Sequence, residues 1–153
     1  MTAAGTFVSG SEDETIHAGA GLSRELAPGS LVILTGPLGA GKTAFVRGMA
    51  VGLGLDPERV HSPSFTLVTE YGPSASGARL AHIDLYRLDR AAEVEELGLD
   101  DYLASGWFVA VEWGERLPAR LQSGAARVIL EDAGGDSRRI TLTPSSSQLS
   151  PSQ

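Results

Sequence analysis

A chain of 153 residues with 42% hydrophobic residues is long enough for one domain with a substantial core, and the absence of cysteine excludes disulfides and zinc–thiolate sites. No apolar run has membrane-spanning length and the first residues lack the positive start of a secretory signal, so we expect a cytoplasmic protein with no membrane partner. The net charge of −7 argues against a protein that holds nucleic acid by itself, because nucleic-acid phosphates are bound by an excess of Lys and Arg.

A helix, a strand and a second helix are expected in the first third of the chain. Residues 11–14 (Ser-Glu-Asp-Glu) form a capping box, which predicts a helix to about residue 26. Residues 31–35 are a short apolar run bounded by turn residues, as in a buried parallel strand. The second helix is expected from about residue 42 to about residue 53, where Gly54 favours its end.

Between that strand and the second helix lies a loop that matches the phosphate-binding pattern G-x-x-x-x-G-K-[ST] at every fixed position. Its residues are Gly36, Pro37, Leu38, Gly39, Ala40, Gly41, Lys42 and Thr43. Glycines let successive backbone N–H groups turn toward an anion, and the following helix adds its positive N-terminal end. We therefore expect Lys42 to bridge the β- and γ-phosphates of a nucleotide and the Thr43 hydroxyl to ligate Mg²⁺. A glycine turn that binds nothing would need neither three glycines nor Lys-Thr, and Lys42 is the only lysine of the chain.

The rest of the chain predicts strands and short helices. Strands are expected at residues 65–71, 79–84, 107–111, 127–131 and 138–143, and helical turns at residues 91–97 and 100–103. These elements predict an α/β fold of three layers, whose mixed β-sheet is parallel in the centre and antiparallel at an edge. Residues 1–143 are expected to form this single domain, and the Ser-, Pro- and Gln-rich residues 144–153 to form a disordered tail.

Two carboxylates stand at strand ends, where a metal ion beside the loop would need them. Asp84 follows the largely apolar residues 80–83 (Leu-Ala-His-Ile), and Glu112 follows the apolar residues 107–111. Ligands of open α/β sheets bind outside the carboxyl ends of the strands, and Mg²⁺ takes oxygen ligands. Either acid alone could also be a solvated loop residue, but as a pair they are the candidate metal ligands.

Other residues near the loop have two interpretations each. Trp113 directly follows Glu112 and suits a nucleotide or partner contact as well as a half-buried core position. Residues 62–66 (Ser-Pro-Ser-Phe-Thr) lie where switch segments that sense the γ-phosphate sit, but a simple turn into a strand would look the same. His61 and His82 are expected to be structural.

The sequence also reduces the number of candidate nucleotides and candidate reactions. GTP-binding switches identify guanine with an Asn-Lys-x-Asp segment, which needs a second lysine, so ATP is favoured. Two classes then remain for a small ATP-binding domain: a small-molecule kinase, and an ATPase that drives or regulates a partner.

Four blocks of the chain resemble the TsaE (YjeE) family, the ATPase of bacterial threonylcarbamoyladenosine synthesis on tRNA. They are residues 36–43, residues 62–68, residues 82–88 (His-Ile-Asp-Leu-Tyr-Arg-Leu) and residues 111–113 (Val-Glu-Trp). Their order and spacing match from about residue 12 to about residue 139. The first block is shared by many ATPases, whereas the last two make the resemblance specific.

The resemblance implies a P-loop NTPase fold, a cytoplasmic location and a weak Mg²⁺-dependent ATPase that binds ATP. It implies action with TsaD and TsaB, which transfer threonylcarbamoyl to the adenosine next to the anticodon. ATP hydrolysis would reset that complex between turnovers, and tRNA would be reached only through the partners. On matching positions, the resemblance implies catalytic roles for Lys42, Asp84 and Glu112. It implies nucleotide contacts for Thr15, Ser62, Thr66, Trp113 and Arg139, or for Arg138 in place of Arg139.

Overall fold

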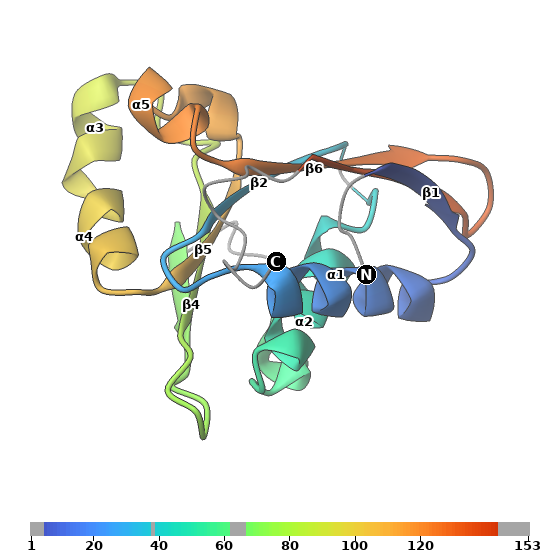
Figure 1. The fold of residues 1–153 in the computed structure, drawn as a ribbon. Helices are drawn as coiled ribbons and strands as arrows, with labels where there is room; N and C mark the ends of the chain where they lie inside the picture. Colours follow the sequence, from blue (N-terminus) through green and yellow to red (C-terminus); the bar gives the residue numbers. More distant parts are fainter. Residues whose placement is uncertain (1–4, 38, 62–66, 144–153) are drawn as a thin grey trace.

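The computed structural model describes residues 5–37, 39–61 and 67–143, which build one mixed sheet with helices on both faces (Figure 1). The strands are β1 (Gly5–Ser9), β2 (Leu31–Thr35), β3 (Val68–Tyr71), β4 (Leu80–Asp84), β5 (Phe108–Glu112), β6 (Ala126–Asp132) and β7 (Arg138–Thr143). The α-helices are α1 (Glu12–Glu25), α2 (Lys42–Gly52), α3 (Ala91–Glu96), α4 (Leu99–Ala104) and α5 (Ala119–Gln122). Two short 3-10 helices, η1 (Pro57–Arg59) and η2 (Gly114–Arg116), complete the elements.

The seven strands lie in the order β1-β7-β6-β2-β5-β4-β3. The four central strands, β6, β2, β5 and β4, run parallel to one another. The pairs β1–β7, β7–β6 and β3–β4 are antiparallel. This arrangement confirms the predicted α/β fold with a parallel centre, and it has antiparallel pairs at both edges of the sheet. The carboxyl ends of the neighbouring strands β2, β5 and β4 therefore lie side by side, at the same end of the parallel strands.

Two hydrophobic clusters fill the space between the sheet and its helices. Along β2, Val32 and Leu34 belong to the cluster that packs against α1 and α2, whereas Leu31 and Ile33 belong to the cluster under α3, α4 and η2. This alternation is the period of two that a strand imposes on its side chains. It explains why β2, buried on both faces, is a continuous apolar run in the sequence.

Helices α1 and α2 approach each other closely at glycines. A Cβ atom built on Gly19 would collide with the backbone oxygen of Phe45, and one on Gly48 would collide with that of Ile16. Small residues at a helix crossing let two backbones come closer than larger side chains would allow. Because α2 begins at Lys42, this crossing also fixes where the glycine-rich loop sits.

Some elements differ from the sequence expectation. The edge strand β1 was not predicted, because four of its five residues are exposed and its pattern gives no clear alternation. The short helix α5 was also not predicted. Residues 65 and 66 of the strand expected at residues 65–71, and the expected tail at residues 144–153, lie outside the described residues. Within the described ranges, no helix has the length and apolar character that crossing a bilayer requires.

Candidate functional site

The glycine-rich loop joins the end of β2 to the start of α2. Gly39 and Gly41 have φ angles of 83° and 101°, in the left-handed region that glycine adopts without strain. Glycine is required at position 36 for a different reason: an added Cβ atom would lie 2.6 Å from the backbone oxygen of Leu130 on β6. Gly36, Gly39 and Gly41 all line the cavity at the start of α2, so the loop backbone borders this space, as an anion cradle requires. Leu38 lies outside the described residues.

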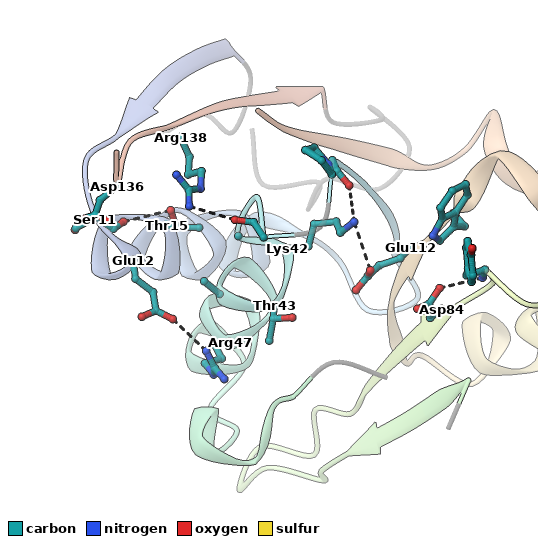
Figure 2. A pocket seen from close by; sticks show the side chains of 17 residues that line it. Ser11, Glu12, Thr15, Lys42, Thr43, Arg47, Asp84, Glu112, Asp136 and Arg138 are labelled. Carbon is teal, nitrogen blue, oxygen red and sulfur yellow. Dashed lines mark hydrogen bonds and ion pairs between the residues drawn. The ribbon is translucent and has the colours of Figure 1, made fainter. Parts of the chain in front are cut away.

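Lys42, the first residue of α2, directs its side chain along the loop (Figure 2). Its ammonium donates a hydrogen bond to the backbone oxygen of Gly36 at 2.5 Å and lies 3.7 Å from Glu112 Oε1. The side chain is 15% exposed, so this positive charge is largely shielded from water. Thr43 is half-buried and lines the same cavity.

Glu112 at the end of β5 is a buried carboxylate held between two partners. Its Oε2 lies 2.9 Å from His82 Nε2, and its Oε1 faces Lys42. Burial raises the pKa of Glu112, but the hydrogen bond from His82 and the charges beside it outweigh burial, so the pKa lies below its usual value. Glu112 is therefore ionised at neutral pH although it is only 7% exposed.

Asp84 is the last residue of β4 and lies beside Glu112 at the carboxyl ends of the parallel strands. The parallel register pairs Asp84 with Glu112, so both carboxylates follow neighbouring strands at equivalent positions. Asp84 Oδ1 accepts a hydrogen bond from the backbone N–H of Tyr86 at 2.9 Å, which orients its carboxyl group. Figure 2 shows Asp84, Glu112 and Lys42 around one hollow. The structure thus brings together the acids that the sequence selected at strand ends.

These side chains fit a magnesium ion that is bound together with phosphate oxygens. In the described ranges, no group of three or more His, Asp or Glu side chains gathers that could hold a metal by itself. Mg²⁺ is usually bound by one or two carboxylates together with substrate phosphates, so Thr43, Asp84 and Glu112 suit it at this place.

An aromatic and arginine cluster borders the hollow beyond Glu112. Trp113 has a φ of 64°, which is uncommon for a bulky residue, and its ring lies 5.1 Å from that of Tyr86. The guanidinium of Arg116 lies 5.1 Å from the Trp113 ring and donates to the backbone oxygens of Leu85, Tyr86 and Leu88. Arg116 therefore ties the segment after β4 to the segment after β5. Trp113 is 38% exposed and lines the cavity.

The opposite wall comes from α1 and the β6–β7 hairpin. Thr15 lines the cavity but is 2% exposed, and its hydroxyl is hydrogen-bonded with that of Ser9 at 2.7 Å. Arg138 lines the cavity and donates to the backbone oxygen of Gly39 at 3.2 Å. Arg139 does not line it and instead lies 3.8 Å from Glu131. Successive strand residues point to opposite faces of the sheet, so only one of the two arginines faces the cavity. The structure therefore favours Arg138 over Arg139 as the arginine that contacts a nucleotide.

All these walls enclose one cavity of about 1130 Å³. Pockets for small molecules are usually about 300–1,000 Å³, so a nucleoside triphosphate has room here. The cavity takes its charged lining from several elements: Lys42 and Arg47 of α2, Glu12 of α1, Asp84 at the end of β4, Glu112 at the end of β5, and Asp136 and Arg138 of the β6–β7 hairpin. Ser62 and Thr66, predicted to contact the nucleotide, lie outside the described residues.

Sequence reasoning missed Arg47 and Asp136. Arg47 follows Thr43 by four residues, so helical spacing could have placed it on the same face of α2. It pairs with Glu12 at 3.2 Å, across the space between α2 and α1. Asp136 sits in a hairpin turn that the topology brings to the loop, and no local pattern signals that approach.

Comparisons with family models, with known sequences and with solved structures all point to the same family. The sequence model of the family described as "Threonylcarbamoyl adenosine biosynthesis protein TsaE" matches residues 9–140. The tRNA threonylcarbamoyladenosine biosynthesis protein TsaE of Bacillus subtilis is 40% identical over 116 residues, which are 76% of this chain and 70% of that protein. The protein of the same name from Treponema pallidum is 36% identical over 135 residues, 88% of this chain and 97% of that protein. The crystal structure of B. subtilis YdiB superposes with a TM-score of 0.70 and 31% identity, covering 93% of this chain and 86% of that one.

Proposed function

Because this chain belongs to the TsaE family and so has a role in tRNA threonylcarbamoyladenosine biosynthesis, we propose that it is the ATP-binding and ATP-hydrolysing subunit of that modification. In this proposal the protein works with TsaD and TsaB, which carry out the transfer to the adenosine next to the anticodon. Hydrolysis of ATP here resets their complex between turnovers. The protein reaches tRNA only through these partners.

One observation carries the proposal: the phosphate-binding loop and the two strand-end carboxylates line a single cavity (Figure 2). Lys42 lies between the loop and Glu112, where its charge can stabilise phosphate oxygens. Phosphoryl transfer depends mainly on positioning and on stabilising the charge of the phosphates, and the loop amides, the start of α2 and Lys42 supply both.

Magnesium, when bound, would neutralise phosphate charge and orient the γ-phosphate for attack by water. Thr43, Asp84 and Glu112 are the residues that would hold it. Glu112 is suited to this role because it is ionised despite its burial. Asp84 is suited because its carboxyl group is oriented by the Tyr86 N–H and leaves one oxygen outside that hydrogen bond.

The proposal is tested by measuring ATP hydrolysis of the purified chain alone, then with TsaD and TsaB, and then with a panel of small hydroxyl acceptors. We expect slow Mg²⁺-dependent hydrolysis that the partner proteins stimulate. Transfer of the γ-phosphate to an acceptor would instead show a small-molecule kinase and would contradict the proposal. A matched Lys42→Ala sample identifies any hydrolysis that comes from a contaminant.

A further inference from the structure

His82 is a fully buried polar side chain next to the cavity but outside its lining. It lies on β4 two residues before Asp84, and its ring is 0% exposed. Its Nε2 lies 2.9 Å from Glu112 Oε2. Its Nδ1 has no hydrogen-bond partner among the residues that the structure describes.

On this face of the sheet, His82 has one polar register partner, Thr69 on β3, and otherwise apolar neighbours. Leu80 precedes it by two residues on β4, and Ala110 is its register partner on β5. Burying an imidazole among apolar side chains costs free energy unless it makes hydrogen bonds. Glu112 lies two residues beyond Ala110 on β5, on the same face of the sheet as His82, and the ring contacts it there. The contact with Glu112 is therefore what compensates for a histidine at this position.

The contact also determines which ring nitrogen carries the proton. A carboxylate only accepts hydrogen bonds, so a neutral ring with its proton on Nδ1 would face Glu112 with a lone pair. That ring would also bury an N–H group without a partner among the described residues. A proton on Nε2 avoids both costs. Nε2–H then donates to Glu112 Oε2.

The two oxygens of Glu112 thus have different surroundings. Oε2 is hydrogen-bonded with the buried His82 ring, whereas Oε1 lies 3.7 Å from the ammonium group of Lys42, which lines the cavity. We propose that His82 is a positioning residue, whose Nε2–H fixes the Glu112 carboxylate so that Oε1 faces the bound nucleotide and its metal ion. This inference rests on the proposed function, because it assigns His82 to the site that hydrolyses ATP.

The geometry is tested without nucleotide by ¹⁵N NMR of the histidine rings in the full chain, with His82 assigned from a His82→Gln sample. A protonated Nε2 at neutral pH supports the proposal. An Nε2 without a proton, with the proton on Nδ1, overturns it. This measurement does not depend on enzymatic activity.

The functional role is tested with two substitutions of different chemistry. His82→Gln keeps an N–H donor near the position of Nε2, whereas His82→Leu keeps similar bulk without a donor. Loss of a group that orients a metal ligand typically costs about 10–100-fold in metal affinity or activity, so we expect His82→Leu to lower Mg²⁺-dependent hydrolysis by at least about tenfold. His82→Gln should retain most of the activity. Equal losses in both variants would overturn the proposal, because the donor would not matter.

A Glu112→Gln background separates this inference from the proposed function. If His82 acts through Glu112, His82→Leu causes no further loss in that background. If the two losses multiply, His82 acts independently and the inference fails while the proposed function stands. If Glu112→Gln alone hydrolyses ATP like the wild type, the proposed role of Glu112 fails, and the inference fails with it.

Discussion

At the scale of single residues, the site places the positive charge of Lys42 beside the negative charge of Glu112, and both side chains are largely shielded from water. Lys42, Glu112 and His82 form a chain of contacts from the loop to the interior of the sheet. Asp84 and Glu112 could be selected from the sequence because each ends a largely apolar strand, and ligands of open α/β sheets bind at the carboxyl ends of strands. The sequence could not decide between Arg138 and Arg139, since which of them faces the loop depends on the register of the β6–β7 hairpin.

We expect Glu112→Gln and Asp84→Asn each to leave a folded protein with poor Mg²⁺-dependent hydrolysis, because each removes a candidate metal-side charge. The measurement is hydrolysis as a function of magnesium concentration. Glu115→Gln is the matched control, since Glu115 is exposed and does not line the cavity. Magnesium titrations of both variants that match the wild type would show that the metal assignment is wrong.

Glu112 also predicts how stability depends on pH. Its pKa in the folded state lies below the ordinary value of 4.5, so in acid the unfolded chain binds a proton more readily than the fold. The stability that Glu112 contributes is fully present above pH 4.5 and is lost as the pH falls through the lowered folded-state pKa. Urea unfolding from pH 7 down to pH 3 should show this loss in the wild type, and a smaller loss in Glu112→Gln. Equal pH dependence of the two proteins would contradict the assignment.

At the scale of elements, the position of the loop depends on the packing of α1 against α2. The sequence predicted both helices to within a few residues, because a capping box and glycine stops bound them. It did not reveal that Gly19 and Gly48 meet, since that contact depends on how two helices cross. For the same reason β1 was missed: it is defined by its pairing with β7 and not by its own pattern.

Gly48→Ala should destabilise the fold, because the added methyl group would collide with the Ile16 backbone oxygen. Overpacking of this kind typically costs about 1–3 kcal/mol in the free energy of unfolding. Gly21→Ala is the matched control: no atom lies within 4 Å of a Cβ at Gly21, a position within helix α1. That control should be neutral or stabilising by up to about 1 kcal/mol, since alanine favours helices over glycine. Chemical denaturation measures both, and equal effects would show that the helix crossing is less tight than described.

At the scale of the whole molecule, the net charge of −7 bears on the proposal that the protein reaches tRNA only through its partners. A family that modifies tRNA would be expected to carry a positive surface if each member held tRNA directly. Here the chain has 12 Lys and Arg residues against 19 Asp and Glu residues. The charge therefore favours a protein that docks on partners which hold the tRNA.

We expect the isolated chain to show no measurable tRNA binding in filter-binding assays at about 150 mM salt, where nonspecific phosphate contacts are weakened. Addition of TsaD and TsaB should bring the chain into a complex that contains tRNA. Tight, salt-dependent binding of tRNA by the isolated chain would contradict the indirect role.

The most direct test of the central claim is calorimetric titration of ATP with Mg²⁺ into the wild type and into Lys42→Ala. The wild type should bind ATP saturably. Loss of charge-assisted hydrogen bonds from Lys42 should weaken binding by about tenfold or more. A wild type that gives no heat of binding, or a Lys42→Ala variant that binds as tightly as the wild type, would contradict the claim that this loop holds the phosphates of ATP.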